Sequence, residues 1–171
     1  MISSRASDPS LVRRMCIAGL LAGAAVLLSG ISIPMGPTRC FPFQHAVNAI
    51  AGVLLGPWWA AGAAVVTSIV RNITGTGTLF AFPGSIPGAL VVGFAYRFIR
   101  KDWVALLEPI GTGPIGATLS ALLLGPALGK SFGLVALQSA FLASSIPGAI
   151  IGYAILRILS RTASGRDFAK D

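Results

Sequence analysis

The chain has 171 residues, of which 54% are hydrophobic and only 11% are charged, and its formal net charge is +8. The apolar residues form long runs separated by short polar breaks, which excludes a large soluble domain and is typical of a helical protein that crosses a membrane several times. The positive charge does not indicate nucleic-acid binding, because the basic residues lie at the ends of the apolar runs instead of forming one patch.

Six membrane-spanning helices are predicted from the apolar runs and from the placement of basic residues. With six spans, ten basic residues fall on the side of both chain ends and three fall on the other side, whereas five spans would remove this asymmetry. The positive-inside rule therefore favours an all-α bundle with both termini in the cytoplasm. The second and third spans are only about 24 to 26 Å long at 1.5 Å per residue. The predicted spans cover residues 15–33, 41–56, 57–72, 84–100, 108–126 and 131–158.

Polar tails are expected before and after the membrane domain in the sequence. The membrane domain comprises residues 15–159. Residues 1–14 are predicted to form a disordered cytoplasmic tail, and residues 160–171 a basic cytoplasmic tail. The start of the chain resembles a signal peptide, but further spans follow it and no clear cleavage motif is seen. A retained first helix is the simpler interpretation.

A polar, glycine-rich stretch from Arg71 to Ala89 interrupts the apolar sequence. Glycine and proline disfavour a regular helix here, so we expect backbone polar groups that need covering protein or a polar cavity. Thr76 and Thr78 add hydroxyls, and Phe82 adds an apolar ring face. The predicted topology places this stretch on the outer side, beside an irregular loop over residues 34–44, and the two predict a small-molecule pocket open to the outside. The alternative is an exposed connecting loop.

Few polar side chains lie within the predicted spans, and these are the candidates for ligand binding. His45 and Asn48 are three residues apart and share a helix face. His45 is interpreted as a hydrogen-bonding residue, with helix packing as the alternative, because no second histidine or carboxylate has metal-ligand spacing. Asn72 either caps its helix or faces the pocket, and Gln138 lies midway along the last span. The predicted substrate-binding residues are Phe43, His45, Asn48, Asn72, Thr76, Thr78, Phe82 and Gln138, and no metal site is predicted.

Glu108 is the only carboxylate near an apolar span apart from Asp102, which is expected to be solvated. The predicted topology places Glu108 at the start of the fifth span, on the cytoplasmic side. A carboxylate at a helix N-terminus is explained by the helix dipole, and contact with a ligand is the alternative.

Motifs for catalysis are missing from the sequence. It has no Gly-x-Ser-x-Gly elbow, no His-Glu-x-x-His pair, no Walker loop and no second carboxylate within the spans for acid–base work. An enzyme is therefore not predicted.

Short segments recur along the chain. The sequence Ser-Ile-Pro-Gly-Ala occupies both 85–89 and 145–149, and Leu-Leu-Gly-Pro occupies both 54–57 and 123–126. Because the offsets differ, we interpret them as reused helix-end chemistry more than as a duplicated half, with chance as the alternative in so apolar a chain.

In the first span, Ala18 and Ala22 form a row of small residues beside Gly19 and Gly23, and such rows let another helix approach closely.

Together these features resemble a known family, the six-helix S-components of energy-coupling factor (ECF) vitamin transporters, and most closely their thiazole-specific ThiW-type members. The resemblance covers roughly residues 15–159. Its most specific parts are Phe-Pro-Phe-Gln-His-Ala-Val-Asn at 41–48, Ala-Gly-Val-Leu-Leu-Gly-Pro-Trp at 51–58 and Gly-Thr-Gly-Thr-Leu-Phe-Ala-Phe-Pro-Gly at 75–84.

The resemblance implies a protein of the prokaryotic cell membrane that captures a thiamine precursor, hydroxyethylthiazole, from outside. Its partners would be a transmembrane coupling protein and two ATPases, which use the ATP, while this chain binds no cofactor. Ala18 and Ala22 would contact the coupling protein. A neutral aromatic ligand would suit a pocket without a buried charge, whereas cationic thiamine would call for a carboxylate. Specificity for another vitamin such as thiamine, and a membrane assembly subunit without a ligand, are the alternatives.

Overall fold

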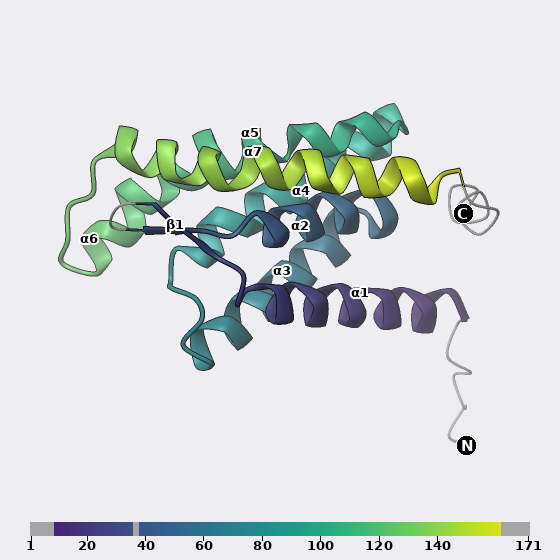
Figure 1. Cartoon of the computed structure of the whole chain (residues 1–171), viewed down its shortest axis with the longest axis horizontal. Coiled ribbons are helices and arrows are strands. Elements are labelled where there is room, and N and C mark those ends of the chain that lie inside the picture. The colour runs from purple at the N-terminus through teal and green to yellow at the C-terminus, as the bar shows by residue number, and fades with distance from the viewer. Residues whose placement is uncertain (1–8, 36–37, 162–171) are drawn as a thin grey trace, which may run out of the picture.

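The computed structural model describes residues 9–35 and 38–161, and these form a helical bundle with one short β-hairpin (Figure 1). Both predicted tails lie mainly outside the described residues. Consecutive helical turns make one segment over Asp102–Ala127, namely η1 (Asp102–Leu107), α5 (Glu108–Ile110), η2 (Gly111–Ala117), η3 (Ser120–Leu124) and α6 (Gly125–Ala127). The longer helices are α1 (Pro9–Leu28), α2 (Pro42–Leu55), α3 (Pro57–Ile73), α4 (Ala81–Ile99) and α7 (Leu134–Leu159).

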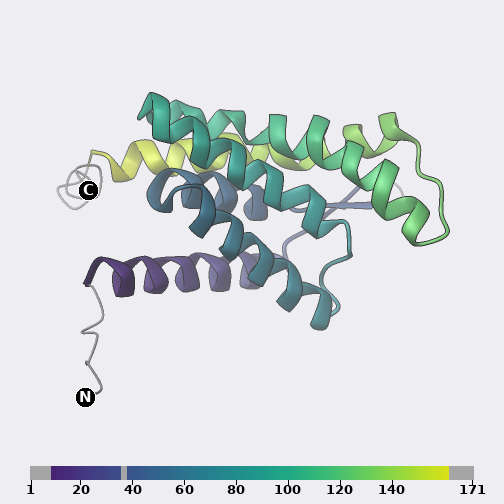
Figure 2. The ribbon, with the colours of Figure 1, turned by 180° about the vertical axis from the view of Figure 1, so that it is seen from behind.

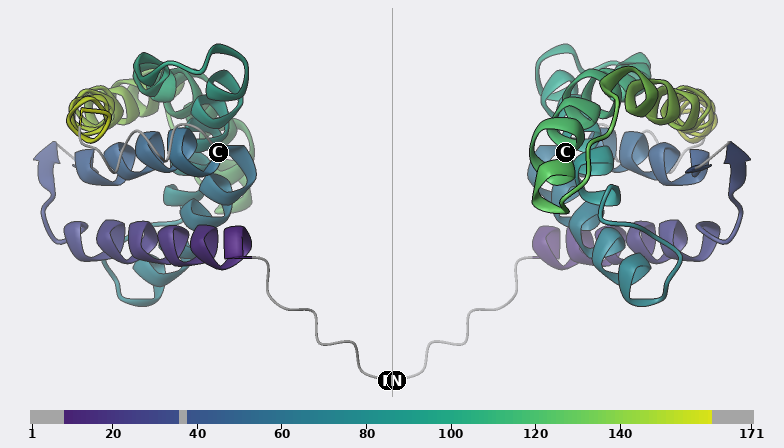
Figure 3. Two further views of the ribbon diagram at one scale, coloured as in Figure 1. Left: turned by 90° about the vertical axis from the view of Figure 1, so that its right-hand side faces the viewer. Right: turned by 90° about the vertical axis from the view of Figure 1, so that its left-hand side faces the viewer.

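The helical segments run back and forth along the long axis of the bundle (Figures 1 and 2). The start of α1 and the end of α7 lie at one end of the bundle, and the hairpin lies at the other. Helix α2 lies between α1 and α7 (Figure 3) and contacts both, as well as α3 and α4. The hairpin pairs β1 (Ile33–Met35) with β2 (Thr38–Cys40) in antiparallel register.

Helix α2 is the centre of the bundle because nearly all of its 14 residues are buried. Its alanines, such as Ala46 and Ala49, let neighbouring helices approach closely. On α7, a Cβ atom placed on Gly148 would lie 2.6 Å from the Cβ of His45 and would also meet the carbonyl of Pro42, so only glycine fits this contact. Small residues thus replace large apolar ones at the helix contacts, as is common in membrane bundles.

Within the described residues, four helical segments are long and apolar enough to cross a membrane. Helices α2 and α3, with 14 and 17 residues, are shorter than these. Many large apolar side chains lie on the outside of the bundle, among them Leu27 and Phe98, each 82% exposed. An apolar exterior suits hydrocarbon and not water. These four candidate membrane spans are Ser10–Leu28, Ala81–Ile99, Asp102–Ala127 and Leu134–Leu159.

The all-α prediction is confirmed, and each predicted span overlaps a helical segment, but the local structure differs at four places. Helix α1 ends at Leu28, so residues 29–33 of the first predicted span are not helical and Ile33 belongs to β1. Helix α1 begins at Pro9, so residues 9–14 are helical and do not belong to a disordered tail. The loop predicted over residues 34–44 contains the hairpin and the first turn of α2. Helix α4 begins at Ala81, so the predicted irregular stretch is restricted to residues 74–80. Pro83 is tolerated in the first turn of α4, where its missing N–H is not needed.

We expect the contact at Gly148 to be sensitive to a single methyl group. Gly148→Ala forces α7 away from α2 and should cost about 1–3 kcal/mol, because overpacking a close contact is destabilising. Gly62→Ala on α3 is the matched control, since a Cβ there meets nothing within 4 Å. Thermal unfolding of the purified protein should give a lower midpoint for Gly148→Ala alone. Equal midpoints would contradict the packing described here.

Candidate binding site

A cavity of about 410 Å³ lies among the β-hairpin, the start of α2, the 74–80 loop and α7. Three aromatic rings, two arginines, a histidine and several hydroxyl-bearing side chains face it. The cavity lining consists of Arg39, Phe41, Gln44, His45, Arg71, Gly75, Thr76, Gly77, Thr78, Phe80, Ala81, Gly84, Ser85, Ala140, Phe141 and Ser144. Its volume is within the range of about 300–1,000 Å³ that is usual for small-molecule sites.

Arg71 is the most buried charged residue of the lining, with 1% of its surface exposed. It lies in the last turn of α3, on the stripe that also buries Ala64, Thr67 and Ser68. Its guanidinium lies over the ring of Phe41, 4.1 Å from the ring centroid, and its Nη2 donates a hydrogen bond of 3.1 Å to the carbonyl of Thr76. The 74–80 loop is therefore folded around an arginine side chain.

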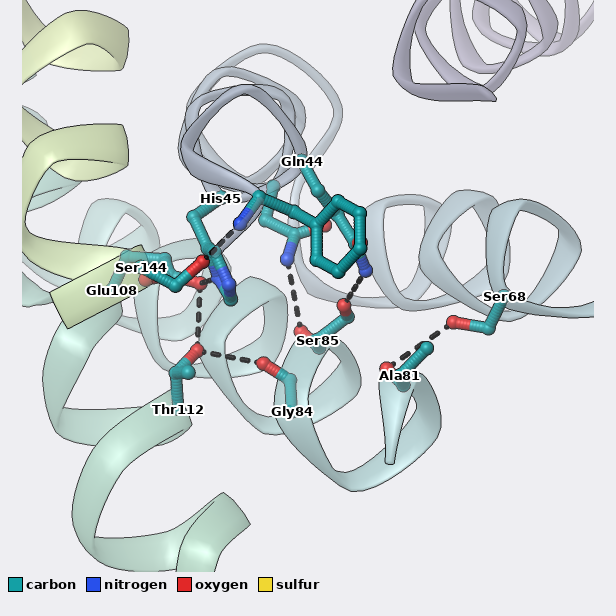
Figure 4. A network of polar contacts seen from close by, with 11 residues as sticks. Gln44, His45, Ser68, Ala81, Gly84, Ser85, Glu108, Thr112 and Ser144 are labelled. Carbon is teal, nitrogen blue, oxygen red and sulfur yellow. Dashed lines mark hydrogen bonds and ion pairs between the residues drawn. The ribbon is translucent and has the colours of Figure 1, made fainter. Parts of the chain in front are cut away.

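Behind the cavity wall, His45 is joined to the only buried carboxylate among the described residues (Figure 4). His45 Nδ1 lies 2.8 Å from Glu108 Oε1, and the same oxygen accepts a hydrogen bond of 2.7 Å from the hydroxyl of Thr112. The Oγ1 atom of Thr112 also lies 2.9 Å from the carbonyl oxygen of Gly84. This network connects α2 with α5 and η2. A hydrogen-bond partner on one ring nitrogen fixes the orientation of an imidazole, and Glu108 has this effect on His45.

The repeated Ser-Ile-Pro-Gly-Ala segments flank this network from two sides. In α4, a Cβ atom on Gly88 would lie 2.6 Å from the hydroxyl of Thr112 and would meet the carboxylate of Glu108. In α7, Gly148 faces His45 in the same way. Each glycine therefore leaves room for one member of the His45–Glu108 pair, which gives the repeat a packing role.

Further hydrogen bonds hold the cavity wall together. The side chain of Gln44 donates to the hydroxyl of Ser85 (Figure 4). Asn48 Nδ2 lies 3.4 Å from the carbonyl oxygen of Ser85, so both Gln44 and Asn48 tie α2 to α4. The backbone N–H of Phe41 donates a 2.7 Å bond to the hydroxyl of Ser144 on α7. Two lining side chains, Gln44 and Ser144, thus already have partners within the protein.

The structure brings three of the predicted substrate-binding residues to the cavity, namely His45, Thr76 and Thr78. Asn72 donates to the carbonyls of Ser68 and Thr78, so it holds the end of α3 and the loop. The predicted residues that do not line the cavity are Phe43, Asn48, Asn72, Phe82 and Gln138. The rings that line the cavity in their place are Phe41, Phe80 and Phe141.

Ala18 and Ala22 face the interior of the bundle. They are 8% and 6% exposed and pack in a cluster with Ala60 and Ala63 of α3. A partner helix therefore cannot reach them in this conformation. The neighbouring row is open, because Gly19 and Gly23 are exposed and a Cβ atom on either would meet nothing within 4 Å.

Two charged groups of the site differ from the sequence-based interpretation. Glu108 begins α5, but the helix dipole does not explain it, because η1 precedes it in the same helical segment and its fully buried carboxylate contacts His45 and Thr112. Its predicted position on the cytoplasmic side stays a prediction. The expectation of a pocket without a buried charge is wrong because of Arg71. Its three- and four-residue spacing from Ser68 and Thr67 continues the buried stripe of α3, and this signal was present in the sequence.

The arrangement favours binding over catalysis. Rings and hydrogen-bonding groups surround the space, while the buried carboxylate of Glu108 lies behind it, with Oε1 in contact with His45 and Thr112 and Oε2 without a partner among the described residues. Among the side chains of the described residues, no group of three histidines, cysteines or carboxylates is placed to hold a metal ion.

The His45–Glu108 contact should be energetically coupled. Glu108→Ala leaves the imidazole without its partner, and His45→Ala leaves a buried carboxylate, so each change should destabilise the protein by about 3–5 kcal/mol. The double variant should lose less than the sum of the two, with a coupling energy of about 1–3 kcal/mol. Thermal or denaturant unfolding of the four proteins measures this cycle. Additive effects would indicate that the two side chains do not interact.

Comparison with known proteins agrees with the resemblance seen in the sequence. Residues 15–162 match the family model described as thiamine-precursor transporter protein (ThiW), which covers most of the chain. No curated protein matches the chain. The matched family is one of transporters and not of enzymes. The chain therefore belongs to the ThiW family of thiamine-precursor transporter proteins.

Proposed function

We propose that this chain is the substrate-binding S-component of an ECF-type importer and captures a thiamine precursor of the hydroxyethylthiazole type. The observation that carries the proposal is the cavity of about 410 Å³, whose wall combines aromatic rings with hydrogen-bonding groups. Such a wall suits a small heteroaromatic ring with a polar arm. Family membership supports the precursor class.

Specific groups in the cavity suit the two parts of such a ligand. Phe41, Phe80 and Phe141 offer ring faces and edges to the thiazole ring. The second ring nitrogen of His45, Nε2, and the hydroxyl of Thr78 can form hydrogen bonds with the polar arm. Glu108 would act as a positioning residue, because it holds the His45 ring in place.

The membrane orientation follows from charge. We propose six crossings with both termini in the cytoplasm, because ten of the thirteen basic residues then lie on the cytoplasmic side. The cavity, at the bundle end far from α1's start, then opens to the outside. Helix α2 would be shielded from lipid by its neighbours, because nearly all of its residues are buried, and this suits its length. Helix α3 would face lipid with one apolar side, which includes Trp58 and Ile73.

Transport would require partners, because the sequence holds no Walker loop. We propose a transmembrane coupling protein and two ATPases that use ATP, with α1 as the contact to the coupling protein. The open row of Gly19 and Gly23 is the part of α1 that another helix could approach closely in this conformation.

Two alternatives are less well supported. Thiamine carries a positive charge, whereas the described lining contains two arginines and no carboxylate. A subunit that only assists assembly would have no use for a polar cavity inside an apolar bundle, where each polar group is costly.

Direct binding tests the proposal. Radiolabelled hydroxyethylthiazole and radiolabelled thiamine should be titrated onto the purified chain. We expect hydroxyethylthiazole to bind and thiamine not to bind. Phe141→Ala should weaken binding of the thiazole by about ten- to a hundred-fold, because it removes a ring contact worth roughly 1–3 kcal/mol. Phe98→Ala is the matched control, since this ring is 82% exposed and lies on α4 away from the cavity. Tighter binding of thiamine would contradict the proposed specificity.

The coupling surface has its own test. Gly19→Leu and Gly23→Leu should abolish uptake into cells and leave ligand binding by the purified chain unchanged, because they block only the exposed row of α1. Ala22→Leu should instead lower the unfolding midpoint, because Ala22 is buried in the bundle. Normal uptake with both glycines replaced would exclude this face of α1 as the contact.

A further inference from the structure

The cavity contains a cation whose charge nothing in the described protein neutralises. Arg71 is 1% exposed, yet no carboxylate lies within ion-pair distance of it among residues 9–35 and 38–161. Glu108, the buried carboxylate of the region, is bound to His45 and Thr112. Burying an unpaired charge is costly, and the ring of Phe41 offsets only part of that cost.

Most of the hydrogen-bonding capacity of Arg71 is also unused. A guanidinium has five N–H donors, but within the described chain Arg71 makes one hydrogen bond, from Nη2 to the carbonyl of Thr76. Its Nε is buried and has no partner. A group of this shape matches an oxygen anion with two or three acceptor atoms, such as a carboxylate or a phosphate.

The surroundings of Arg71 add to this preference. Arg39, on the hairpin strand β2, is exposed and lines the same cavity, so a second positive charge lies at the site. The hydroxyl of Thr78 can donate a further hydrogen bond from the loop, whereas that of Thr76 already donates to the carbonyl of Arg71. Asp and Glu are absent from the described lining, so nothing there would repel an anion.

We infer that the ligand enters this cavity with an anionic oxygen group, a phosphate ester or a carboxylate, which Arg71 holds beside the ring-binding surface. The thiamine precursor taken up would then be a charged thiazole and not the neutral alcohol. The identity of the ring rests on the proposed function, whereas the anionic group rests on the contacts of Arg71.

Calorimetry on the 171-residue chain separates these two statements. Four compounds should be titrated: hydroxyethyl methylthiazole, its phosphate monoester, the analogue with a carboxymethyl arm, and inorganic phosphate. The parent protein should bind at least one of the two charged thiazoles ten-fold or more tightly than the alcohol, as expected for charge-assisted hydrogen bonds. Inorganic phosphate should compete weakly with the charged thiazole.

Variants then assign the preference to Arg71. Arg71→Gln should weaken binding of the charged thiazole by ten- to a hundred-fold and change binding of the alcohol by less than three-fold. Arg71→Lys should restore part of the loss, because it returns the charge without the planar fork. Arg97→Gln removes the same charge from an exposed position at the end of α4 and should have no effect. Since the comparison of ligands on the parent protein needs no variant, it decides the case even if Arg71→Gln does not fold.

Each result has a distinct meaning. Tighter binding of the alcohol than of both charged compounds would overturn the inference and leave the proposed function standing. Binding of inorganic phosphate without any thiazole would overturn the proposed function and support the anion site. Failure of all four compounds to bind would overturn both.

Discussion

A carboxylate buried in an apolar bundle must find partners inside the protein, and Glu108 finds them in His45 and Thr112. This requirement determines how α2 is placed, because His45 lies in its first turns and Glu108 lies on another helical segment. Gly88 and Gly148 then become necessary, since a methyl group at either position would occupy the space of the pair. The position of α2, the packing of α4 and α7 and one wall of the cavity all depend on this contact.

The cavity lies on the other side of the same histidine, and its second anchor is Arg71. The 74–80 loop wraps around this arginine, with the backbone N–H groups of Thr76 and Gly77 each 2.9 Å from the carbonyl of Arg71. A Cβ atom on Gly77 would lie 2.9 Å from the Cβ of Arg71, so glycine is needed for the loop to pass so closely. The glycine-rich stretch therefore has a structural cause, which is to bring hydroxyls and rings to a space beside a buried cation.

The helices could be predicted because the long apolar runs mark the helical segments, and because Gly56-Pro57 marks the end of α2 and the start of α3. His45, Thr76 and Thr78 could be assigned to the site because polar side chains are rare in such a sequence. Phe82 could not be excluded, because the choice between neighbouring rings depends on where α4 begins. The sequence-based interpretation of Glu108 fails because the predicted span begins at residue 108, whereas the helical segment begins at Asp102. Arg71 lies inside the predicted span 57–72, so its burial follows from the stripe that it shares with Thr67 and Ser68 and not from a shifted boundary. Long-range contacts such as that between Phe41 and Ser144 leave no local pattern.

Labelling of a single cysteine at Thr78 would test the central claim, that an outward-facing cavity in this bundle binds a thiamine precursor. In a chain whose Cys16 and Cys40 are replaced by alanine, Thr78→Cys should react with a membrane-impermeant maleimide added to intact cells, because Thr78 is exposed and lines the cavity. Addition of the thiazole ligand should slow this reaction several-fold, while Lys101→Cys should react only after the membrane is opened. Labelling of Thr78→Cys only in opened membranes, or at a rate that no thiazole compound changes, would contradict the account.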